Sequence, residues 1–111
     1  MSVLVVLITA PRGEGNRIAK ELVNSKAAAC VNVISGVHST YWWEGKVEES
    51  DEDLLIVKTT QDAYGKLEEV VRKVHPYKVP EVLALEVKAG LAEYLSWVEG
   101  SVSAGSPPSS H

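Results

Sequence analysis

Two residues of this sequence, Cys30 and His75, carry side chains that bind metal ions. A thiolate and an imidazole together suit a soft or borderline ion such as copper or zinc. Two ligands alone make a weak site, so Glu48, Glu49, Tyr77, Glu81 or a group from a neighbouring subunit must complete it. We therefore predict a metal site formed by Cys30, His75 and Glu81, with copper or another divalent metal ion as its occupant.

Each of these two residues also has a purely structural explanation. Cys30 stands beside Ala29 and Val31, and a lone cysteine in apolar surroundings is commonly a buried small hydrophobe. His75 ends a predicted helix, where the helix dipole favours the imidazolium form and Pro76 fixes the chain direction. Its alternative is a helix-ending histidine that bonds to the backbone. The sequence alone leaves both alternatives open.

Two further stretches of the sequence could bind an ion. Gly13-Glu14-Gly15 leads into a helix, whose N-terminus can bind phosphate. It matches only the first half of G-x-G-x-x-G, so a glycine-eased loop is the favoured interpretation. The acidic run Glu48 to Asp53 attracts divalent cations, but a charged strand edge that blocks aggregation is favoured. No serine, histidine and acidic residue have a spacing that suggests a catalytic triad, and the motifs C-x-x-C and H-E-x-x-H do not occur. We therefore expect that the protein is not an enzyme.

Composition restricts the class of protein further. The 111 residues fit one domain, and 45% of them are hydrophobic, which is ordinary for a globular chain. The net charge of −4, with acids and bases mixed, argues against nucleic-acid binding. No apolar run is long enough to cross a bilayer, and the first residues lack the features of a signal peptide. A single cysteine favours a reducing compartment, so we expect a cytoplasmic protein without a membrane partner.

Hydrophobic periodicity predicts the elements that position these candidates. Their order, βαββαβ plus a C-terminal helix, is typical of the α+β, ferredoxin-like split-βαβ sandwich, with both main helices on one face of an antiparallel sheet. We predict a single domain over residues 1–100 and a flexible tail rich in Ser, Gly and Pro over 101–111. The predicted ranges are strands at 2–9, 31–43, 46–58 and 82–87, and helices at 17–26, 61–74 and 91–98.

The two middle strands predict one long hairpin that protrudes from the domain. Each arm holds about 13 residues and spans on the order of 40 Å, more than a helix of this chain can cover. Glu44-Gly45 marks the turn and Gly36 a bulge or bend. The tip carries Tyr41, Trp42 and Trp43, and we predict that these side chains lie at a subunit interface. By alternation, the first arm presents one bulky face: Val31, Val33, Val37, Tyr41 and Trp43.

Five short blocks occur in order at close spacing: AACVN at 28–32, YWWEGK at 41–46, KTT at 58–60, HPY with VPE at 75–81, and YLSW at 94–97. Together they resemble the CutA family of divalent-cation tolerance proteins over roughly residues 3–98. The resemblance implies a ferredoxin-like fold assembled as a homotrimer, similar to PII-type signalling proteins, and a link to tolerance of copper and other divalent cations. Many members have an acid where Lys78 stands, and its loss predicts weaker cation binding here. The residues of functional interest that the resemblance implies are Cys30, Lys58, His75, Tyr77 and Glu81.

Three functions follow from the residues and the resemblance. The first is a homotrimeric divalent-cation (copper) tolerance and binding protein without catalysis or a required cofactor. The second is a PII-like signalling protein that binds a small anionic ligand in clefts between subunits, with Lys58, Tyr77 and Arg12 as candidate lining residues. The third is a structural or anchoring trimer. For the first two functions we expect the site beside the base of the hairpin, near Cys30 and Lys58, rather than at its tip.

Overall fold

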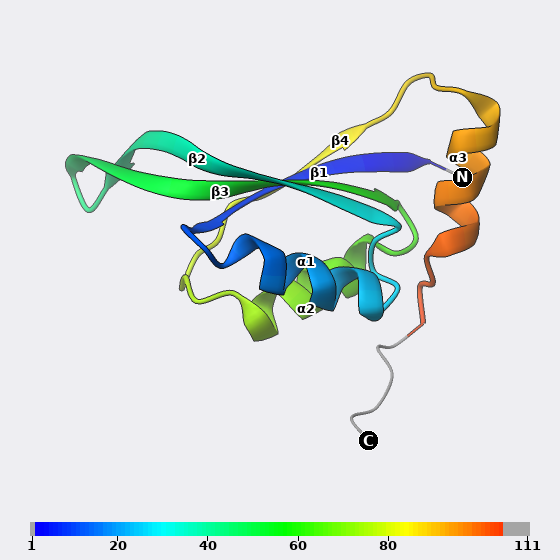
Figure 1. Cartoon of the computed structure of the whole chain (residues 1–111), viewed down its shortest axis with the longest axis horizontal. Helices are drawn as coiled ribbons and strands as arrows, with labels where there is room; N and C mark the ends of the chain where they lie inside the picture. Colours follow the sequence, from blue (N-terminus) through cyan, green and yellow to red (C-terminus); the bar gives the residue numbers. More distant parts are fainter. Residues whose placement is uncertain (1, 106–111) are drawn as a thin grey trace.

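A computed structural model describes residues 2–105 of the chain. The predicted order of elements is confirmed, and each predicted strand and helix is present (Figure 1). The elements are β1 (Val3–Pro11), α1 (Gly15–Asn24), β2 (Cys30–Trp43), β3 (Lys46–Thr60), α2 (Tyr64–Val74), β4 (Val82–Glu86) and α3 (Ala92–Ser101).

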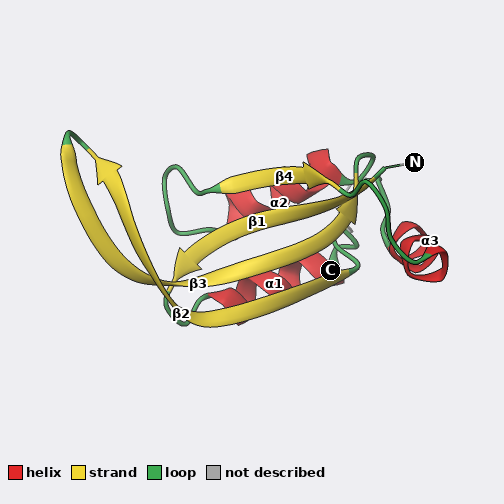
Figure 2. Cartoon of the chain, turned by 90° about the horizontal axis from the view of Figure 1, so that it is seen from above, coloured by secondary structure: helices red, strands yellow, loops and turns green. Residues whose placement is uncertain are grey.

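The strands form one sheet in the order β2-β3-β1-β4, and every neighbouring pair is antiparallel. Helices α1 and α2 lie side by side against one face of this sheet, whereas α3 lies beyond its end (Figures 1 and 2). This is the predicted α+β, ferredoxin-like arrangement. The continuous apolar run of β1 is explained by its place between β3 and β4.

The core lies between the sheet and the two helices. Strand β1, and β3 from Asp53 onward, alternate along the chain, so every second side chain faces α1 and α2 and is buried. Fully burying one large aliphatic side chain stabilises the fold by about 2 kcal/mol. The largest side chains of this core are Val6, Ile8, Ile18, Leu22, Leu55, Val57, Leu67 and Val71.

The hairpin of β2 and β3 forms as predicted. Glu44 and Gly45 have φ of 49° and 78°, so both central turn residues are left-handed and Trp43 pairs directly with Lys46. Gly36, at φ 81°, lies in a bulge where the register shifts between Ile34 and Val37. Beyond this bulge the paired ribbon curves away from the domain (Figure 2).

The bulge makes one prediction wrong. Val31 and Val33 pair with Val57 and Leu55 and pack against the core, on the side of α1. Because the bulge inserts an extra residue, Val37 pairs with Glu52, and the alternation is reversed beyond it. Val37, Tyr41 and Trp43 therefore lie on the opposite face of the sheet from Val31 and Val33, and the first arm does not present a single bulky face.

The ends of the helices differ from the prediction by a few residues. Helix α2 begins at Tyr64, after a turn in which Thr60 Oγ1 accepts a hydrogen bond from the Ala63 amide at 3.2 Å. Helix α3 continues through Ser101, and the Ser103 amide donates to the Lys26 carbonyl at 3.0 Å. Residues 106–111 of the predicted flexible tail lie outside the described residues.

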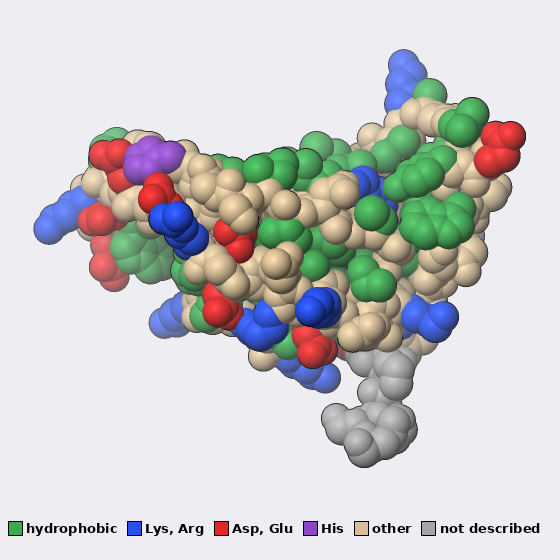
Figure 3. Space-filling view, viewed as in Figure 1, with side chains coloured by type: hydrophobic (Ala, Val, Ile, Leu, Met, Phe, Trp, Pro, Cys, Tyr) green, Lys and Arg blue, Asp and Glu red, His purple; other side chains and the backbone are tan. Residues whose placement is uncertain are grey.

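The sheet face opposite α1 and α2 is open and apolar. No helix among the described residues covers it in Figure 2, and Figure 3 shows hydrophobic side chains gathered along this side of the molecule. Exposed aliphatic side chains in a continuous patch of this kind mark an interaction surface. We call this surface the open face; its apolar residues include Val5, Leu7, Ile34, Leu54, Ile56, Leu83 and Leu85.

Candidate functional site

Cys30 lies at the base of the ribbon, as predicted, and pairs with Lys58. The Lys58 ammonium is 4.0 Å from the Cys30 sulfur and donates to the Asn32 side-chain oxygen. The Tyr94 hydroxyl is close to the thiol, and burial, followed by the neighbouring Cys30, raises the pKa of Tyr94. Cys30 is thus a half-buried thiol beside an ammonium group, at the α3 end of the open face.

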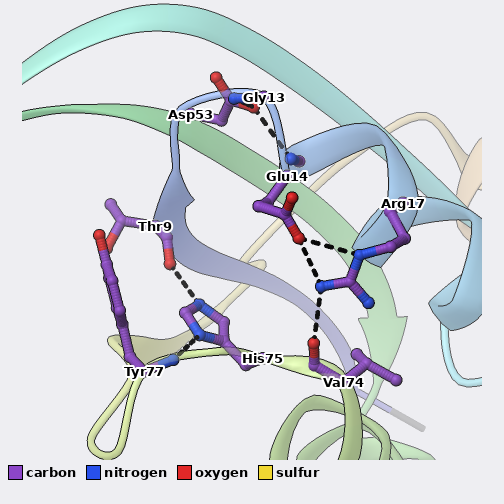
Figure 4. Close-up of polar contacts among 9 residues, drawn as sticks. Thr9, Gly13, Glu14, Arg17, Asp53, Val74, His75 and Tyr77 are labelled. Carbon is purple, nitrogen blue, oxygen red and sulfur yellow. Dashed lines mark hydrogen bonds and ion pairs between the residues drawn. The ribbon is translucent and has the colours of Figure 1, made fainter.

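His75 is held by two backbone groups. Its Nε2 lies 2.7 Å from the Thr9 carbonyl oxygen, and its Nδ1 accepts a hydrogen bond from the Tyr77 amide at 3.1 Å (Figure 4). A carbonyl can only accept, so Nε2 carries the proton and the imidazole is neutral. Only 8% of His75 is exposed. This is the structural alternative left open by the sequence, because neither ring nitrogen is free to bind a metal ion.

The predicted metal ligands do not meet within one chain. Cys30 pairs with Lys58, and Lys58 pairs with Val5. The His75 contact is with Thr9, four residues further along β1. At about 3.3 Å per residue, the position of Cys30 and the Thr9 contact of His75 are roughly 13 Å apart along the strands. Within residues 2–105, no group of three His, Cys, Asp or Glu side chains is arranged to hold a metal ion. Glu81 lies in a pocket near His75, away from Cys30.

That pocket, which we call the acidic pocket, lies on the open face where the ribbon leaves the domain. Its volume is about 630 Å³. Glu52 of β3 is only 6% exposed, and its Oε2 accepts a hydrogen bond from the Tyr77 hydroxyl at 2.8 Å. The His75 contacts fix the backbone at Tyr77 and so aim its ring at Glu52. The lining residues are Thr9, Ser39, Thr40, Tyr41, Trp43, Glu52, Tyr77, Lys78, Val79 and Glu81.

Negative charge dominates the electrostatics of the acidic pocket. Burial, followed by the hydrogen bond to Glu52, raises the pKa of Tyr77 to about 12. Burial and the nearby Glu52 carboxylate also raise the pKa of Glu81. Burial disfavours the charged form of both groups, and the negative charge of Glu52 adds to this effect. A cation bound between the two glutamates relieves this repulsion, so the arrangement suits a cationic ligand.

The residues predicted to line an anion cleft do not come together. Lys58 lies beside Cys30, at the opposite end of the sheet from Tyr77. Arg12 is largely exposed, and its Nη1 is 3.8 Å from Asp51 Oδ2. Only Tyr77 lines the acidic pocket. Within one chain, this charge pattern does not favour an anion.

The Gly13-Glu14-Gly15 loop already contains an anion from the protein itself. Asp53 Oδ2 accepts hydrogen bonds from the amides of Gly13 at 3.0 Å and Gly15 at 2.9 Å (Figure 4). A Cβ at Gly15 would lie 2.8 Å from the same oxygen, so glycine is required by this close approach. Asp53 takes the place that a phosphate would need, in agreement with the favoured interpretation of a structural loop.

Sequence reasoning missed Glu52 as a site residue because it treated residues 48–53 as one charged edge. A usable signal was present. Leu55 and Val57 are apolar residues of one parity, and counting back by two puts Asp53 on their face and Glu52 on the opposite one. The contact with Tyr77 had no such signal, because it depends on the path of the loop before β4.

A family model described as CutA1 divalent ion tolerance protein matches residues 4–101. The chain belongs to this family. It is 53% identical over 95 residues to the divalent-cation tolerance protein CutA of Thermus thermophilus, covering 85% of this chain and 92% of that relative. It is 46% identical over 99 residues to the chloroplastic protein CutA 1 of Oryza sativa, covering 88% of this chain but 56% of that relative. The chain thus spans about half the length of the rice protein. The predicted resemblance is confirmed.

Solved structures of the family confirm the fold. The divalent cation tolerance protein of Thermus thermophilus superposes with a TM-score of 0.89 at 48% identity, covering 91% of this chain and 99% of that one. A Nostoc protein, described as PII-like protein CutA in apo form, superposes with a TM-score of 0.86 at 34% identity, covering 95% and 100%. Among residues 2–105 of the present chain, no helix is both long and apolar enough to cross a membrane.

Proposed function

We propose that this chain works in divalent-cation tolerance as a homotrimer that binds divalent cations, copper among them, without catalysing a reaction. The observation that carries the proposal is that Glu52 and Glu81 line the same pocket, where burial, followed by the charge of Glu52, raises the pKa of Glu81. Carboxylates held together against their repulsion form a site that a cation stabilises.

The acidic pocket offers oxygen ligands, which accept many divalent ions. Among first-row divalent ions, affinity at a given site is highest for copper, so the predicted ion does not need the Cys30 thiol. Glu52 and Glu81 would bind the ion, and water or a neighbouring subunit would supply the remaining ligands. His75 then has a positioning role, since its two hydrogen bonds hold the backbone at Tyr77.

The proposed trimer is supported by the open face and by the ribbon. Leu83 and Leu85 are more than half exposed, and Trp42 is 74% exposed. Burial of such side chains against other subunits would remove from water an apolar surface that one chain leaves uncovered. Replacing Trp42 and Trp43 by serine should weaken association, because buried aromatic anchors contribute about 2 kcal/mol or more each. An unchanged sedimentation profile in the double variant would contradict a role for these two residues in assembly.

Copper titration tests the cation site. We expect Glu81→Gln and Glu52→Gln to weaken Cu²⁺ binding, as measured by calorimetry on the full chain. Cys30→Ala is the matched test of the prediction from the sequence, and Glu69→Gln, on the exposed side of α2, controls for net charge. The proposal fails if both pocket variants bind Cu²⁺ as tightly as the unmodified protein, and a loss confined to Cys30→Ala would assign the ion to the thiol.

A PII-like signalling role is the second candidate, and the size of the acidic pocket favours it. Its 630 Å³ lies in the range of small-molecule sites, well above what one metal ion fills. The family relative described as PII-like supports the same role. A thermal-shift screen of small metabolites of both charges tests this candidate, since a ligand that binds the native state raises the unfolding temperature. No stabilisation by any compound would count against it.

The remaining expectations concern the cell. We propose a cytoplasmic location, because the one cysteine of the chain suits a reducing compartment. The rice and Arabidopsis relatives are named chloroplastic, so location varies among family members. The formal charge of −4 supports the absence of a nucleic-acid partner. Fractionation of the source cells, followed by detection of the protein, tests the location.

A further inference from the structure

Lys66 occupies an unusual position for a lysine. It lies in the first turn of α2 and is only 6% exposed, although lysine is rarely buried without a partner. The ion pairs of residues 2–105 are formed by Arg12, Arg17 and His38, and none involves a lysine. In the same part of the chain, Asp53 alone has a buried side-chain oxygen or nitrogen without a partner. The Lys66 ammonium therefore reaches solvent at the end of a covered carbon chain.

A second lysine lies at the same place. Helices α1 and α2 are antiparallel, so the end of α1 and the beginning of α2 lie at one end of the helical layer (Figure 1). Lys26 follows α1 there, and its carbonyl accepts a hydrogen bond from the Ser103 amide at 3.0 Å. Burial, followed by the charge of Lys26, lowers the pKa of Lys66. We call Lys26 and Lys66 the lysine pair.

The lysine pair combines three features that each oppose folding. Lys26 has a φ of 62°, a left-handed conformation that glycine adopts more readily. Lys66 lies in the first turn of α2, where the helix dipole is already positive and no acidic residue compensates it. The two ammonium groups also repel each other. An anion bound between them offsets the second and third features together.

The end of α1 does not supply this negative charge. Its last carbonyls, those of Glu21, Leu22 and Val23, already accept hydrogen bonds from the amides of residues 25–28 at 3.0 to 3.1 Å. The lysine pair also lies on the side of α1 and α2, away from the open face and the ribbon. Assembly of subunits through those two surfaces therefore leaves it accessible.

We propose that the lysine pair binds a phosphate group, either as inorganic phosphate or as part of a small phosphorylated molecule. A phosphate ester carries a charge of about −1.5 to −2 at pH 7, which matches two ammonium groups. Its oxygens accept the charge-assisted hydrogen bonds that ammonium groups donate. A monoanion neutralises only one lysine. This site is separate from the acidic pocket and goes beyond the proposed function.

Anions of different charge test the proposal on the full chain. We expect inorganic phosphate, added at constant ionic strength, to shift the backbone NMR signals of residues 26 and 65–66, and acetate and chloride to leave them nearly unchanged. Glycerol phosphate separates the two sources of the ligand. Tighter binding of this ester supports a phosphorylated molecule, and tighter binding of phosphate supports the free ion. An equal response to acetate, or no response to either phosphate compound, would overturn the proposal.

Two variants test the two lysines separately. Lys66→Met keeps a buried carbon chain without the charge and should weaken phosphate binding about tenfold. Lys26→Gly should weaken it about threefold while raising the unfolding temperature, because glycine suits the left-handed conformation. A purely structural Lys26 would not change stability and binding in opposite directions. Lys73→Gln, at the exposed other end of α2, is the charge control and should bind phosphate like the unmodified protein. Unchanged binding in both lysine-pair variants would overturn the proposal.

Separate titrations with copper and with phosphate distinguish this inference from the proposed function. Lys66→Met should bind Cu²⁺ like the unmodified protein, because the acidic pocket lies on the other side of the sheet. Phosphate binding without Cu²⁺ binding would retain the lysine pair and overturn the metal site. Cu²⁺ binding without phosphate binding would retain the metal site and overturn the role of the lysine pair.

Discussion

The acidic residues of β3 fall on two faces of the sheet, and the two groups have different surroundings. On the side of α1, Asp53 accepts two backbone amides, while Asp51 and Glu49 contact His38 at 2.9 and 2.7 Å. On the open side, Glu52 accepts a hydrogen bond from the Tyr77 hydroxyl, and its charge adds to the burial that raises the pKa of Glu81. Asp53 thus holds the loop before α1, Asp51 and Glu49 form an exposed cluster with His38, and Glu52 is the acid of β3 that we propose as a cation ligand.

The difference comes from strand alternation combined with one close approach. Gly13 and Gly15 bring the loop before α1 onto the sheet next to Asp53, so that carboxylate is enclosed. Glu52, one residue earlier, points the other way and accepts a hydrogen bond from the Tyr77 hydroxyl. Binding sites are often built from groups whose interactions are incomplete in the free protein, at some cost in stability.

Removing Asp53 should have the largest effect on stability. Asp53→Ala leaves two loop amides without their acceptor, and each unsatisfied buried donor costs about 1–3 kcal/mol. We expect a loss of about 3 kcal/mol in the free energy of unfolding, measured by urea denaturation at fixed protein concentration. A variant within about 0.5 kcal/mol of the unmodified protein would show that the loop does not depend on this carboxylate.

Filling the same close approach should have the next largest effect. Gly15→Ala places a methyl group 2.8 Å from both Asp53 Oδ2 and a Val33 methyl, and such overpacking costs about 1–3 kcal/mol. Gly65→Ala in α2 is the matched control, since nothing lies within 4 Å of its added Cβ. This control should stabilise the protein by about 0.5–1 kcal/mol. Equal stabilities of the two variants would contradict the enclosure of Asp53.

Neutralising the open-side acid should leave the fold intact. Glu52→Gln keeps an acceptor for the Tyr77 hydroxyl and removes the repulsion with Glu81, so we expect its free energy of unfolding to change by less than about 1 kcal/mol. The same variant should lose cation binding. Denaturation and calorimetry on one sample check both. A large loss of stability would place Glu52 with the structural acids.

The smallest effect should come from His38. Its two ring nitrogens face Asp51 and Glu49, and only the imidazolium form can donate a hydrogen bond to both. The hydrogen bond to Asp51, followed by that to Glu49, therefore raises the pKa of His38 above 6.5. The resulting stabilisation is fully present below the pKa of the histidine in the unfolded chain. It is lost as the pH rises through the pKa of His38 in the folded protein. The cluster is exposed, so the change should be small. NMR titration of His38 checks the direction, and a folded pKa below 6.5 would contradict it.

Much of the fold could be predicted from local patterns, and the site could not. Alternation in β1 and β3, helical spacing at Leu67 and Val71, and Glu44-Gly45 each encode one element, so the order and sheet followed from them. The Gly36 bulge was expected, but its consequence for side-chain direction was not applied to Tyr41 and Trp43. The pairing of Cys30 with His75 failed within one chain for a different reason: contacts between distant segments depend on strand register, which the sequence does not state.

Paramagnetic relaxation by Mn²⁺ tests the central claim, that the cation site is the acidic pocket. Trace Mn²⁺ broadens NMR signals close to where it binds and leaves distant ones sharp. We predict broadening centred on Glu52, Tyr77 and Glu81, absent in Glu81→Gln, with the signals of Cys30 and Lys58 unaffected. Broadening centred on Cys30 that survives in Glu81→Gln would contradict the account and return the site to the base of the ribbon.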